Sequence, residues 1–259
     1  DDYIESVWWI LKTAWDRGLL YQGYKIVPYC PRCGTPLSSH EVSQGYQSVS
    51  EESVTVTMPI RGEPQRQFLV WTTTPWTLPS NIALAVHRDL TYADVLHRPS
   101  GRTYILAEEL VNRVFEKELD CIEVVRTYPG ARVLGLEYEP LFRLYQGDRR
   151  AYYVIHGDFV STAEGTGIVH IAPAFGEEDY QVGTESDLPT LQPVDLKGNF
   201  TGEFPEFANV FVKDADAGII NLLKQRGRLL RVDMYTHEYP FCWRCATPLL
   251  YYAKAAWFL

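Results

Sequence analysis

Long hydrophobic runs and a targeting segment are both missing from this chain. No apolar stretch among its 259 residues approaches the roughly 18 residues of a membrane-spanning helix. The first residues, DDYIESVWWILKTAWDRG, lack the basic start and the small-residue cleavage site of a secretory signal. We therefore expect a cytoplasmic protein that does not bind a membrane.

Positive charge is also scarce. The chain has 24 lysine and arginine residues against 33 aspartate and glutamate residues, which gives a net charge of −9 at pH 7. A broad contact with nucleic acid usually needs a basic face, so the composition argues against one. Three short basic stretches, 126–132, 147–150 and 224–231, are candidates for a local contact, although each is more typical of an ordinary solvated surface.

Only five cysteines are present, and four of them form the pairs CPRC (30–33) and CWRC (242–245). Such a pair lets two thiolates reach one tetrahedral ion, and a second pair completes the shell. The spacing predicts one structural zinc site formed by Cys30, Cys33, Cys242 and Cys245. Four thiolates leave no open coordination position, so no catalytic metal is implied. A redox pair or two independent thiol pairs would use the same residues.

The segment between the cysteine pairs is dense in short strands. These stretches are β-branched or aromatic and are bounded by Gly, Pro, Asn or Asp. The spacing of apolar residues predicts helices over 2–17, 108–118 and 214–226, the last with Asp214 as its N-cap. This many short strands is typical of a barrel or a sandwich.

We therefore predict an α+β, β-rich fold in which a β-barrel-like domain with peripheral helices hangs from a zinc-pinned neck. The neck comprises an N-terminal helix and the first cysteine pair (1–48), the barrel domain spans 49–235, and the second cysteine pair follows (236–259). Both ends of the chain look cut from a larger protein, because no cap precedes the first helix and the last residues stop within an apolar pattern.

A run of three threonines ends one predicted strand in FLVWTTTPWTLPSNIALAV (68–86). If the strand continues, Thr72 and Thr74 point to one face and Thr73 to the other. Pro75 is placed to begin a helical turn with Thr74 as its N-cap. Hydroxyls beside free backbone N–H groups are able to hold a carbonyl oxygen, an oxyanion or a water molecule. The alternative is a strand that ends at a proline and has no function.

A second group of polar residues lies in EGTGIVHIAPAFGEEDY (164–180). The Gly165–Gly167 turn permits a close approach of the backbone to a ligand. His170 shares a strand face with small apolar residues, and the acidic run that follows suits a helix start, where a carboxylate is able to bind an amino group. The alternatives are a hydrogen-bonded core histidine and a solvated first helical turn.

Together these motifs resemble the editing domain inserted in isoleucyl-tRNA synthetases, also called connective polypeptide 1. The resemblance is carried by WTTTPWTLPSNIALAV (71–86), GTGIVHIAPAFGEEDY (165–180) and the two cysteine pairs, and it covers essentially the whole chain. Related insertions of valyl- and leucyl-tRNA synthetases typically contain Thr-Thr-Arg-Pro, whereas Thr74 stands at the arginine position here. The His-Ile-Gly-His-like and Lys-Met-Ser-Lys-Ser-like signatures of amino acid activation are missing, so the resemblance implies an excised fragment without the synthetic site.

The resemblance implies hydrolysis of the aminoacyl ester of valyl-tRNA(Ile), and of valyl-adenylate as a further substrate, in a pocket that excludes isoleucine. Asp179 would bind the α-amino group of the valine moiety, and the glycine turn would receive the terminal adenosine. The implied catalytic residues are Asp179, Thr72, Thr73, Thr74 and His170, and the implied substrate-binding residues are Trp76, Thr77, Asn81, Gly165, Thr166 and Gly167. The implied partners are the 3′ end of tRNA(Ile) and the catalytic core of the parent synthetase, with the chain a monomer.

No base that would activate a threonine is evident in the sequence, so we expect the hydroxyls to position substrate or water rather than to attack. Two other functions remain open. One is a zinc-stapled tRNA-binding module without catalysis. The other is a free-standing hydrolase of a small ester or amide, which the lack of a Ser/His/Asp or Cys/His signature disfavours.

Overall fold

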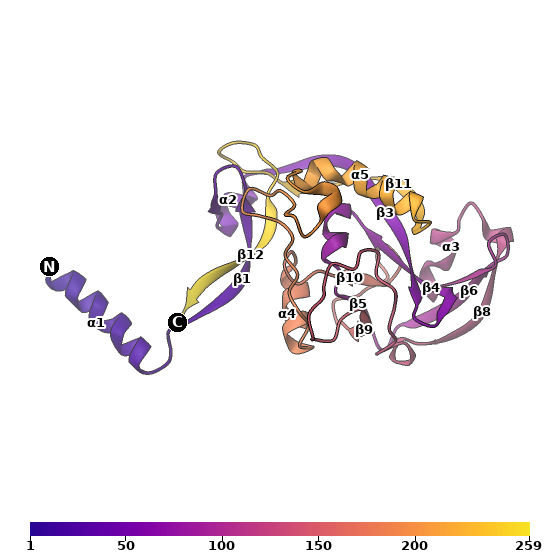
Figure 1. Cartoon of the computed structure of the whole chain (residues 1–259), viewed down its shortest axis with the longest axis horizontal. Helices are drawn as coiled ribbons and strands as arrows, with labels where there is room; N and C mark the ends of the chain where they lie inside the picture. Colours follow the sequence, from indigo (N-terminus) through magenta and orange to yellow (C-terminus); the bar gives the residue numbers. More distant parts are fainter.

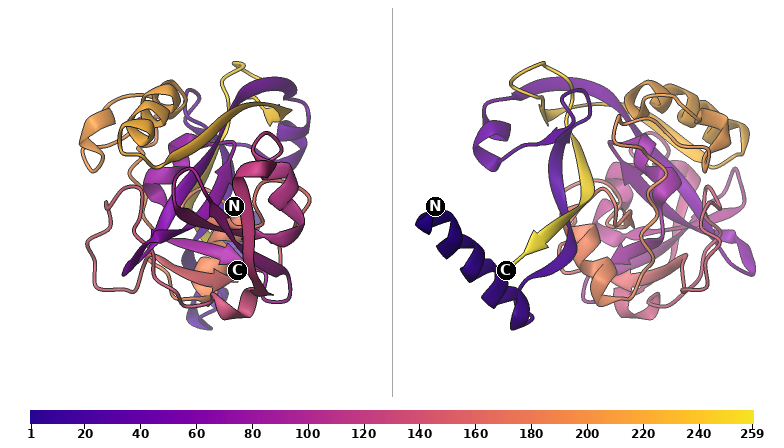
Figure 2. Two further views of the ribbon diagram at one scale, coloured as in Figure 1. Left: turned by 90° about the vertical axis from the view of Figure 1, so that its right-hand side faces the viewer. Right: turned by 60° about the vertical axis from the view of Figure 1, so that its left-hand side comes forward.

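The computed structural model describes residues 1–259 and shows a rounded body joined to a projecting neck (Figure 1). The neck is an antiparallel ribbon of β1 (Tyr21–Cys30) and β12 (Leu250–Phe258), with the short β2 (Thr35–Pro36) beside β1. Helix α1 (Asp2–Asp16) extends from the far end of this ribbon and lies away from the body in the right-hand view of Figure 2. Both chain ends therefore lie on the same side of the molecule.

The body is built on a six-stranded sheet with the order β11-β3-β4-β7-β6-β8. Neighbouring strands are antiparallel except for the parallel pair β4 and β7. The two outer strands, β11 and β8, are not paired with each other, so the sheet stays open. Its strands are β3 (Tyr46–Ile60), β4 (Glu63–Thr72), β6 (Thr91–His97), β7 (Arg102–Ala107), β8 (Ile122–Pro129) and β11 (Leu229–Pro240).

A smaller sheet packs beside the large one and has the order β10-β5-β9, formed by β5 (Ala83–Val86), β9 (Tyr153–His156) and β10 (Val169–Ile171). All four residues of β5 are buried. Leu84 and Val86 pack into the main core, whereas Ala83 and Ala85 pack into a second, smaller core. A strand buried on both faces accounts for the unbroken apolar sequence ALAV.

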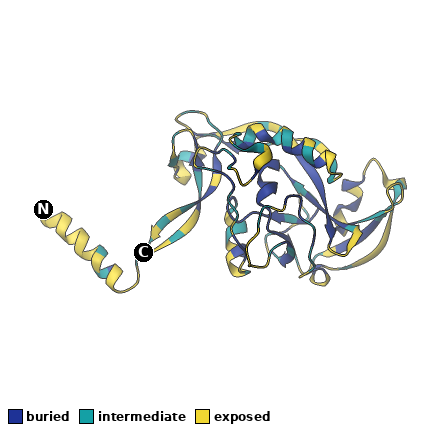
Figure 3. Cartoon of the chain, in the orientation of Figure 1, coloured by how far each residue is buried: buried dark blue, intermediate teal, exposed yellow.

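The helices lie around the edges of these sheets and in the loops. The α-helices are α2 (Ser39–Ser43), α3 (Val111–Val114), α4 (Glu177–Glu185) and α5 (Val212–Gln225), and the 3-10 helices are η1 (Pro75–Ser80), η2 (Glu108–Leu110), η3 (Leu119–Cys121), η4 (Gly130–Arg132) and η5 (Pro205–Phe207). Burial is concentrated in the body, while α1 and the outer end of the neck are largely exposed (Figure 3). None of the helices has both the length and the apolar character needed to cross a lipid bilayer.

The prediction of a β-rich α+β fold is confirmed, but the strands form three open sheets and no closed barrel. The predicted helix over 108–118 is shorter, because it consists of η2 and α3 and ends at Val114. The Arg231 guanidinium donates a hydrogen bond of 2.7 Å to the Val114 carbonyl, which would otherwise accept from the next helical turn.

The predicted N-cap of the 214–226 helix is also wrong. Helix α5 begins two residues earlier, with Phe211 as its N-cap, because the Val212 amide donates to the Gly198 carbonyl and Val212 is fully buried. A tertiary contact thus sets the start of the helix, and Asp214 falls in its first turn, where an acidic side chain is still favourable.

Candidate functional site

The four paired cysteines converge at the base of the neck. Cys30 ends β1, and the second pair lies in the loop between β11 and β12. All four Sγ atoms lie within 4.8 Å of one another. The Sγ–Sγ distance is 3.5 Å from Cys30 to Cys245 and 3.9 Å from Cys33 to Cys242. Sulfurs placed about 2.3 Å from a tetrahedral ion are separated by roughly 3.8 Å, so this donor set fits one such metal ion.

The two cysteine loops have the same backbone design. The residue after each second cysteine has a positive φ, which is 69° for Gly34 and 55° for Ala246. The Gly34 amide donates to the Cys30 carbonyl, and the Ala246 amide donates to the Cys242 carbonyl. In the first loop the Cys33 amide also donates to the Cys30 Sγ. The backbone therefore curls around each sulfur pair and directs both pairs to one point.

The threonine run lies where β4 ends and η1 begins. The Thr72 and Thr74 hydroxyl oxygens are 3.2 Å apart, so the prediction that these two side chains share a face is confirmed. The Thr74 hydroxyl is also 3.3 Å from the Thr77 hydroxyl, which donates to the Thr74 carbonyl. The half-buried Thr73 takes no part in these contacts. Three hydroxyls on one turn thus form a connected chain.

His170 continues this chain from the strand β10. Its Nε2 atom lies 3.1 Å from the Thr77 hydroxyl oxygen, and its Nδ1 atom is buried without a partner. Because the Thr77 hydroxyl already donates to the Thr74 carbonyl, we assign the Nε2–H tautomer, which donates to Thr77. Burial lowers the pKa of His170 to about 4, so the ring is neutral at physiological pH.

Asp179 is carried by α4, the helix that follows the His170 strand. One carboxyl oxygen accepts a hydrogen bond of 2.9 Å from the amide of Ala172, two residues beyond His170. Burial raises the pKa of this carboxyl group to about 7, and the Ala172 amide opposes that shift. Phe175, which lies between His170 and Asp179 in the sequence, packs edge-on against Trp76 of η1, with ring centroids 5.0 Å apart. The structure therefore links the threonine turn, His170 and Asp179 through adjacent segments.

The glycine turn packs on the Trp71 side of β4. The Thr166 hydroxyl donates to the Leu69 carbonyl at 2.7 Å, and a Cβ at Gly165 would lie 3.0 Å from the Trp71 ring. No hydrogen bond joins this turn to the threonine hydroxyls. Trp71 and Gly165 line a cavity of about 400 Å³ together with Tyr235, whose ring stands edge-on to Trp71. Side chains alternate along a strand, so this cavity opens on the face of β4 opposite to Thr72.

Asn81 is buried just before β5, and both ends of its side-chain amide are hydrogen-bonded within the chain. It donates to the Ala83 carbonyl at 2.8 Å and accepts from the Tyr138 hydroxyl at 2.6 Å. These contacts match a residue that holds the end of the strand.

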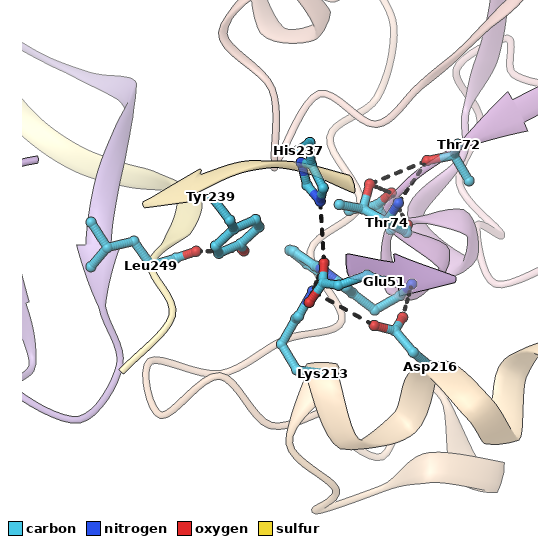
Figure 4. Close-up of polar contacts among 10 residues, drawn as sticks. Glu51, Thr72, Thr74, Lys213, Asp216, His237, Tyr239 and Leu249 are labelled. Atoms are coloured by element: carbon cyan, nitrogen blue, oxygen red, sulfur yellow. Dashed lines mark hydrogen bonds and ion pairs between the residues drawn. The ribbon is translucent and has the colours of Figure 1, made fainter. Parts of the chain in front are cut away.

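Three charged residues that the sequence analysis missed lie beneath the threonine turn (Figure 4). Asp216 of α5 accepts a hydrogen bond of 2.8 Å from the backbone amide of Trp76. Lys213, one turn earlier on α5, pairs with Glu51 of β3 at 2.7 Å and lies 3.9 Å from Asp216. No local pattern in KDADAG marks these side chains, because their partners lie far away in the sequence.

Comparison with known proteins gives consistent results. The chain is 51% identical over 259 residues to an isoleucine–tRNA ligase of Clostridium acetobutylicum, covering 100% of this chain and 24% of that protein. It is 46% identical over 257 residues to an isoleucine–tRNA ligase of Bacillus thuringiensis, covering 99% and 24%. The chain thus spans about a quarter of the length of these relatives. The crystal structure of GlLeuRS-CP1 shares the fold, with a TM-score of 0.56 and 16% identity, covering 71% of this chain and 99% of that one.

The family described as tRNA synthetases class I (I, L, M and V) matches residues 1–259. That match takes in the cysteine neck, the threonine turn and the His170–Asp179 segment together. The chain belongs to the class I tRNA synthetases of the isoleucine, leucine, methionine and valine group.

Proposed function

We propose that this chain is an editing domain that hydrolyses the ester bond of valyl-tRNA(Ile) and, as a further substrate, the mixed anhydride bond of valyl-adenylate. The observation that carries the proposal is the chain of hydroxyls from Thr72 through Thr74 and Thr77 to the neutral His170. Such a row of small polar groups suits an ester and a water molecule better than it suits a core, where hydroxyls offer little packing. The similarity to isoleucine–tRNA ligases supports the choice of substrate.

In this proposal the side chains bind and orient, and none attacks. The Asp179 carboxylate holds the α-ammonium group of the amino acid, because a charge-assisted hydrogen bond is strong in a buried site. The threonine hydroxyls hold the ester carbonyl and the water. The water oxygen adds to the carbonyl carbon, the bond from that carbon to the ribose oxygen breaks, and the ribose oxygen takes up the proton that the water releases. His170 is a poor base, since its pKa is about 4.

Selection against isoleucine rests on the size of the pocket. Valine lacks one methylene of isoleucine, which provides only about 1–3 kcal/mol of discrimination, a magnitude for which isoleucyl-tRNA synthetases are themselves the standard example. A second site that admits valine and rejects isoleucine multiplies that selectivity. Trp76 and His170 are the bulky buried groups beside the threonines, and we propose that they set the limit.

The remaining features serve placement. We propose that the four cysteines bind one zinc ion, which supplies a closed tetrahedral shell and fixes the base of the neck. Residues 1–48 and 236–259, which include the neck, then join the editing body to the catalytic core of the parent synthetase. We propose that the backbone of the glycine turn, which packs against Trp71 near the end of β4, receives the terminal adenosine of the tRNA.

The decisive experiment compares deacylation of valyl-tRNA(Ile) and isoleucyl-tRNA(Ile) by the 259-residue chain. We expect release of valine and retention of isoleucine. Binding of both tRNAs without release of either amino acid would instead identify a recognition module. Equal release of both amino acids would contradict the proposed size limit while leaving the esterase activity in place.

A further inference from the structure

The 3-10 helix η1 has an uncommon N-terminal cap. Thr74 occupies the N-cap position, where a threonine side chain ordinarily accepts a hydrogen bond from a backbone amide of the first turn. Here the Thr74 side chain accepts no hydrogen bond from these amides. Pro75 has no N–H, and the Thr77 amide donates to the Thr74 carbonyl, so the Trp76 amide is the one donor of this turn that needs an outside acceptor.

Asp216 supplies that acceptor from another element. Its Oδ1 atom accepts from the Trp76 amide at 2.8 Å, and its other carboxyl oxygen lies 3.9 Å from the Lys213 ammonium group. Lys213 is held in turn by Glu51 of β3 (Figure 4). Burial raises the pKa of Asp216 to about 7. The cap persists in both protonation states, because a carboxylate and a protonated carboxyl group each have an oxygen that accepts a hydrogen bond.

The consequence concerns the Thr74 hydroxyl. In a conventional cap the Thr74 hydroxyl would instead direct a lone pair at the Trp76 amide. Because Asp216 takes over the capping, the Thr74 hydroxyl stays 3.2 Å from Thr72 and 3.3 Å from Thr77, within the hydroxyl chain that leads to His170.

We propose that Asp216 is a positioning residue that caps η1 in place of Thr74 and so keeps the Thr74 hydroxyl in the editing site. This inference rests on the proposed editing function. Asp216 touches no substrate in this proposal, and its effect on hydrolysis passes through the orientation of one hydroxyl. Lys213 and Glu51 hold the carboxyl group in place and act one step further back.

The test is a double-mutant cycle in the 259-residue chain, with hydrolysis of valyl-tRNA(Ile) and thermal unfolding as readouts. Asp216→Ala should lower kcat about 10- to 100-fold with KM within about twofold, the range expected when a reacting group is misplaced by about 1 Å. Asp216→Asn keeps an acceptor oxygen and should retain activity within about threefold. Asp214→Ala is the matched control, because Asp214 lies exposed on the same helix and should leave hydrolysis unchanged.

The cycle is completed with Thr74→Val. Once the hydroxyl is absent, Asp216→Ala should lower kcat by no more than about twofold further, because its effect passes through that hydroxyl. Fully multiplicative effects of the two substitutions, or a fully active Asp216→Ala chain, would overturn the inference. If the alanine variant melts below the assay temperature, Asp216→Ser, whose shorter side chain does not span the distance to the Trp76 amide, replaces it in the cycle.

A crystal structure of the Asp216→Ala chain gives a readout that does not depend on activity. The Thr74 hydroxyl should there turn to the Trp76 amide and leave Thr72 and Thr77. A hydroxyl that keeps its original contacts would contradict the positioning role even if hydrolysis fell. A wild-type chain that releases no valine would instead contradict the proposed function, and the structure would still decide the role of Asp216.

Discussion

The cysteine neck and the threonine turn both gather side chains from distant parts of the chain, but they do so in opposite ways. In the neck the four sulfurs come from two loops of the same design and face one another. At the threonine turn the polar groups come from η1, β10, α4 and α5, and of these elements only β10 and α4 lie in one sequence motif. The neck uses the same local loop conformation twice, whereas the arrangement of the threonine turn depends on the tertiary fold.

The two regions also differ in how completely their polar groups are satisfied. One ion would saturate the neck with four thiolates. At the threonine turn, the Nδ1 atom of His170 and the indole nitrogen of Trp76 are buried without hydrogen-bond partners. Burial also keeps the pKa of Asp179 and of Asp216 near 7. Unpaired groups and shifted carboxyl groups cost stability, and such costs are typical of sites that act on a ligand.

The largest expected effect is the loss of the metal from the neck. Chelation, or Cys242→Ser, should destabilise the neck by an amount on the order of 10 kcal/mol, because the ion binds the folded arrangement and not the unfolded loops. Calorimetry with metal analysis measures this, and about one ion per chain should be found. Cys121→Ser is the control, since Cys121 lies outside the cluster. An unchanged unfolding profile after metal removal would show that no metal ion stabilises the neck.

The next effect belongs to the threonine turn. Asp179→Ala should lower kcat/KM for valyl-tRNA(Ile) hydrolysis about a thousandfold, because the α-ammonium group loses its buried counter-charge. The variant should stay folded at the assay temperature, because removal of a desolvated carboxyl group offsets the lost hydrogen bond from the Ala172 amide. Glu178→Ala is the matched control, because that side chain is the exposed neighbour on the same helix. Hydrolysis at the wild-type rate in the folded alanine variant would remove Asp179 from the mechanism.

The pH dependence of the free energy of unfolding tests whether the Asp179 carboxyl group is destabilising in its charged form. Burial raises the pKa of Asp179 from 3.8 to about 7, so the native chain holds a proton that the unfolded chain releases. The stabilising contribution of this group is therefore complete below about pH 4 and is lost as the pH rises through about 7. Asp179→Asn mimics the protonated form. Its free energy of unfolding relative to wild type should increase by about 2–3 kcal/mol between pH 5 and pH 8.

Chemical denaturation at both pH values measures that difference. Glu185→Gln is the control, because this exposed side chain lies at the other end of the same helix and does not contribute to the pKa shift of Asp179. A constant difference between Asp179→Asn and wild type across this range would mean that the Asp179 carboxyl group titrates like an exposed one. The contrast with the neck would then rest on the unpaired His170 and Trp76 atoms alone.

The sequence revealed most of the neck and about half of the threonine turn. Spacing within CPRC and CWRC identifies all four sulfurs, and strand alternation correctly places Thr72 and Thr74 on one face. Strands β1 and β12 were missed, because their exposed residues and the Gly23 and Pro28 of β1 hide a strand pattern. The barrel was predicted from the number of strands, but strand number does not determine whether the outer strands pair.

Asp216 shows where local reasoning ends. Its partner, the Trp76 amide, is 140 residues away, and a backbone amide leaves no trace in the sequence. Its helix also begins at Val212 rather than at Asp214, because a buried contact with Gly198 sets the start. Sequence spacing therefore cannot reveal a residue whose partner is a backbone group of another element. It can reveal metal ligands, because these are recognised by their residue type.

The smallest effect returns to the two matching loops of the neck. Gly34 and Ala246 occupy the same position with φ of 69° and 55°, and only the glycine adopts this conformation without strain. Relief of roughly 1–2 kcal/mol of strain is partly offset by the extra freedom of glycine in the unfolded chain, so Ala246→Gly should stabilise the chain by about 0.5–1 kcal/mol. Gly34→Ala should destabilise it by a similar amount. A Cβ at Gly34 would meet nothing closer than 3.9 Å, so that loss would come from the backbone alone. Thermal unfolding of the metal-loaded chains measures both changes. Opposite signs of similar size would show that the loops are energetically equivalent, and a neutral Ala246→Gly would show that the second loop relieves its strain elsewhere.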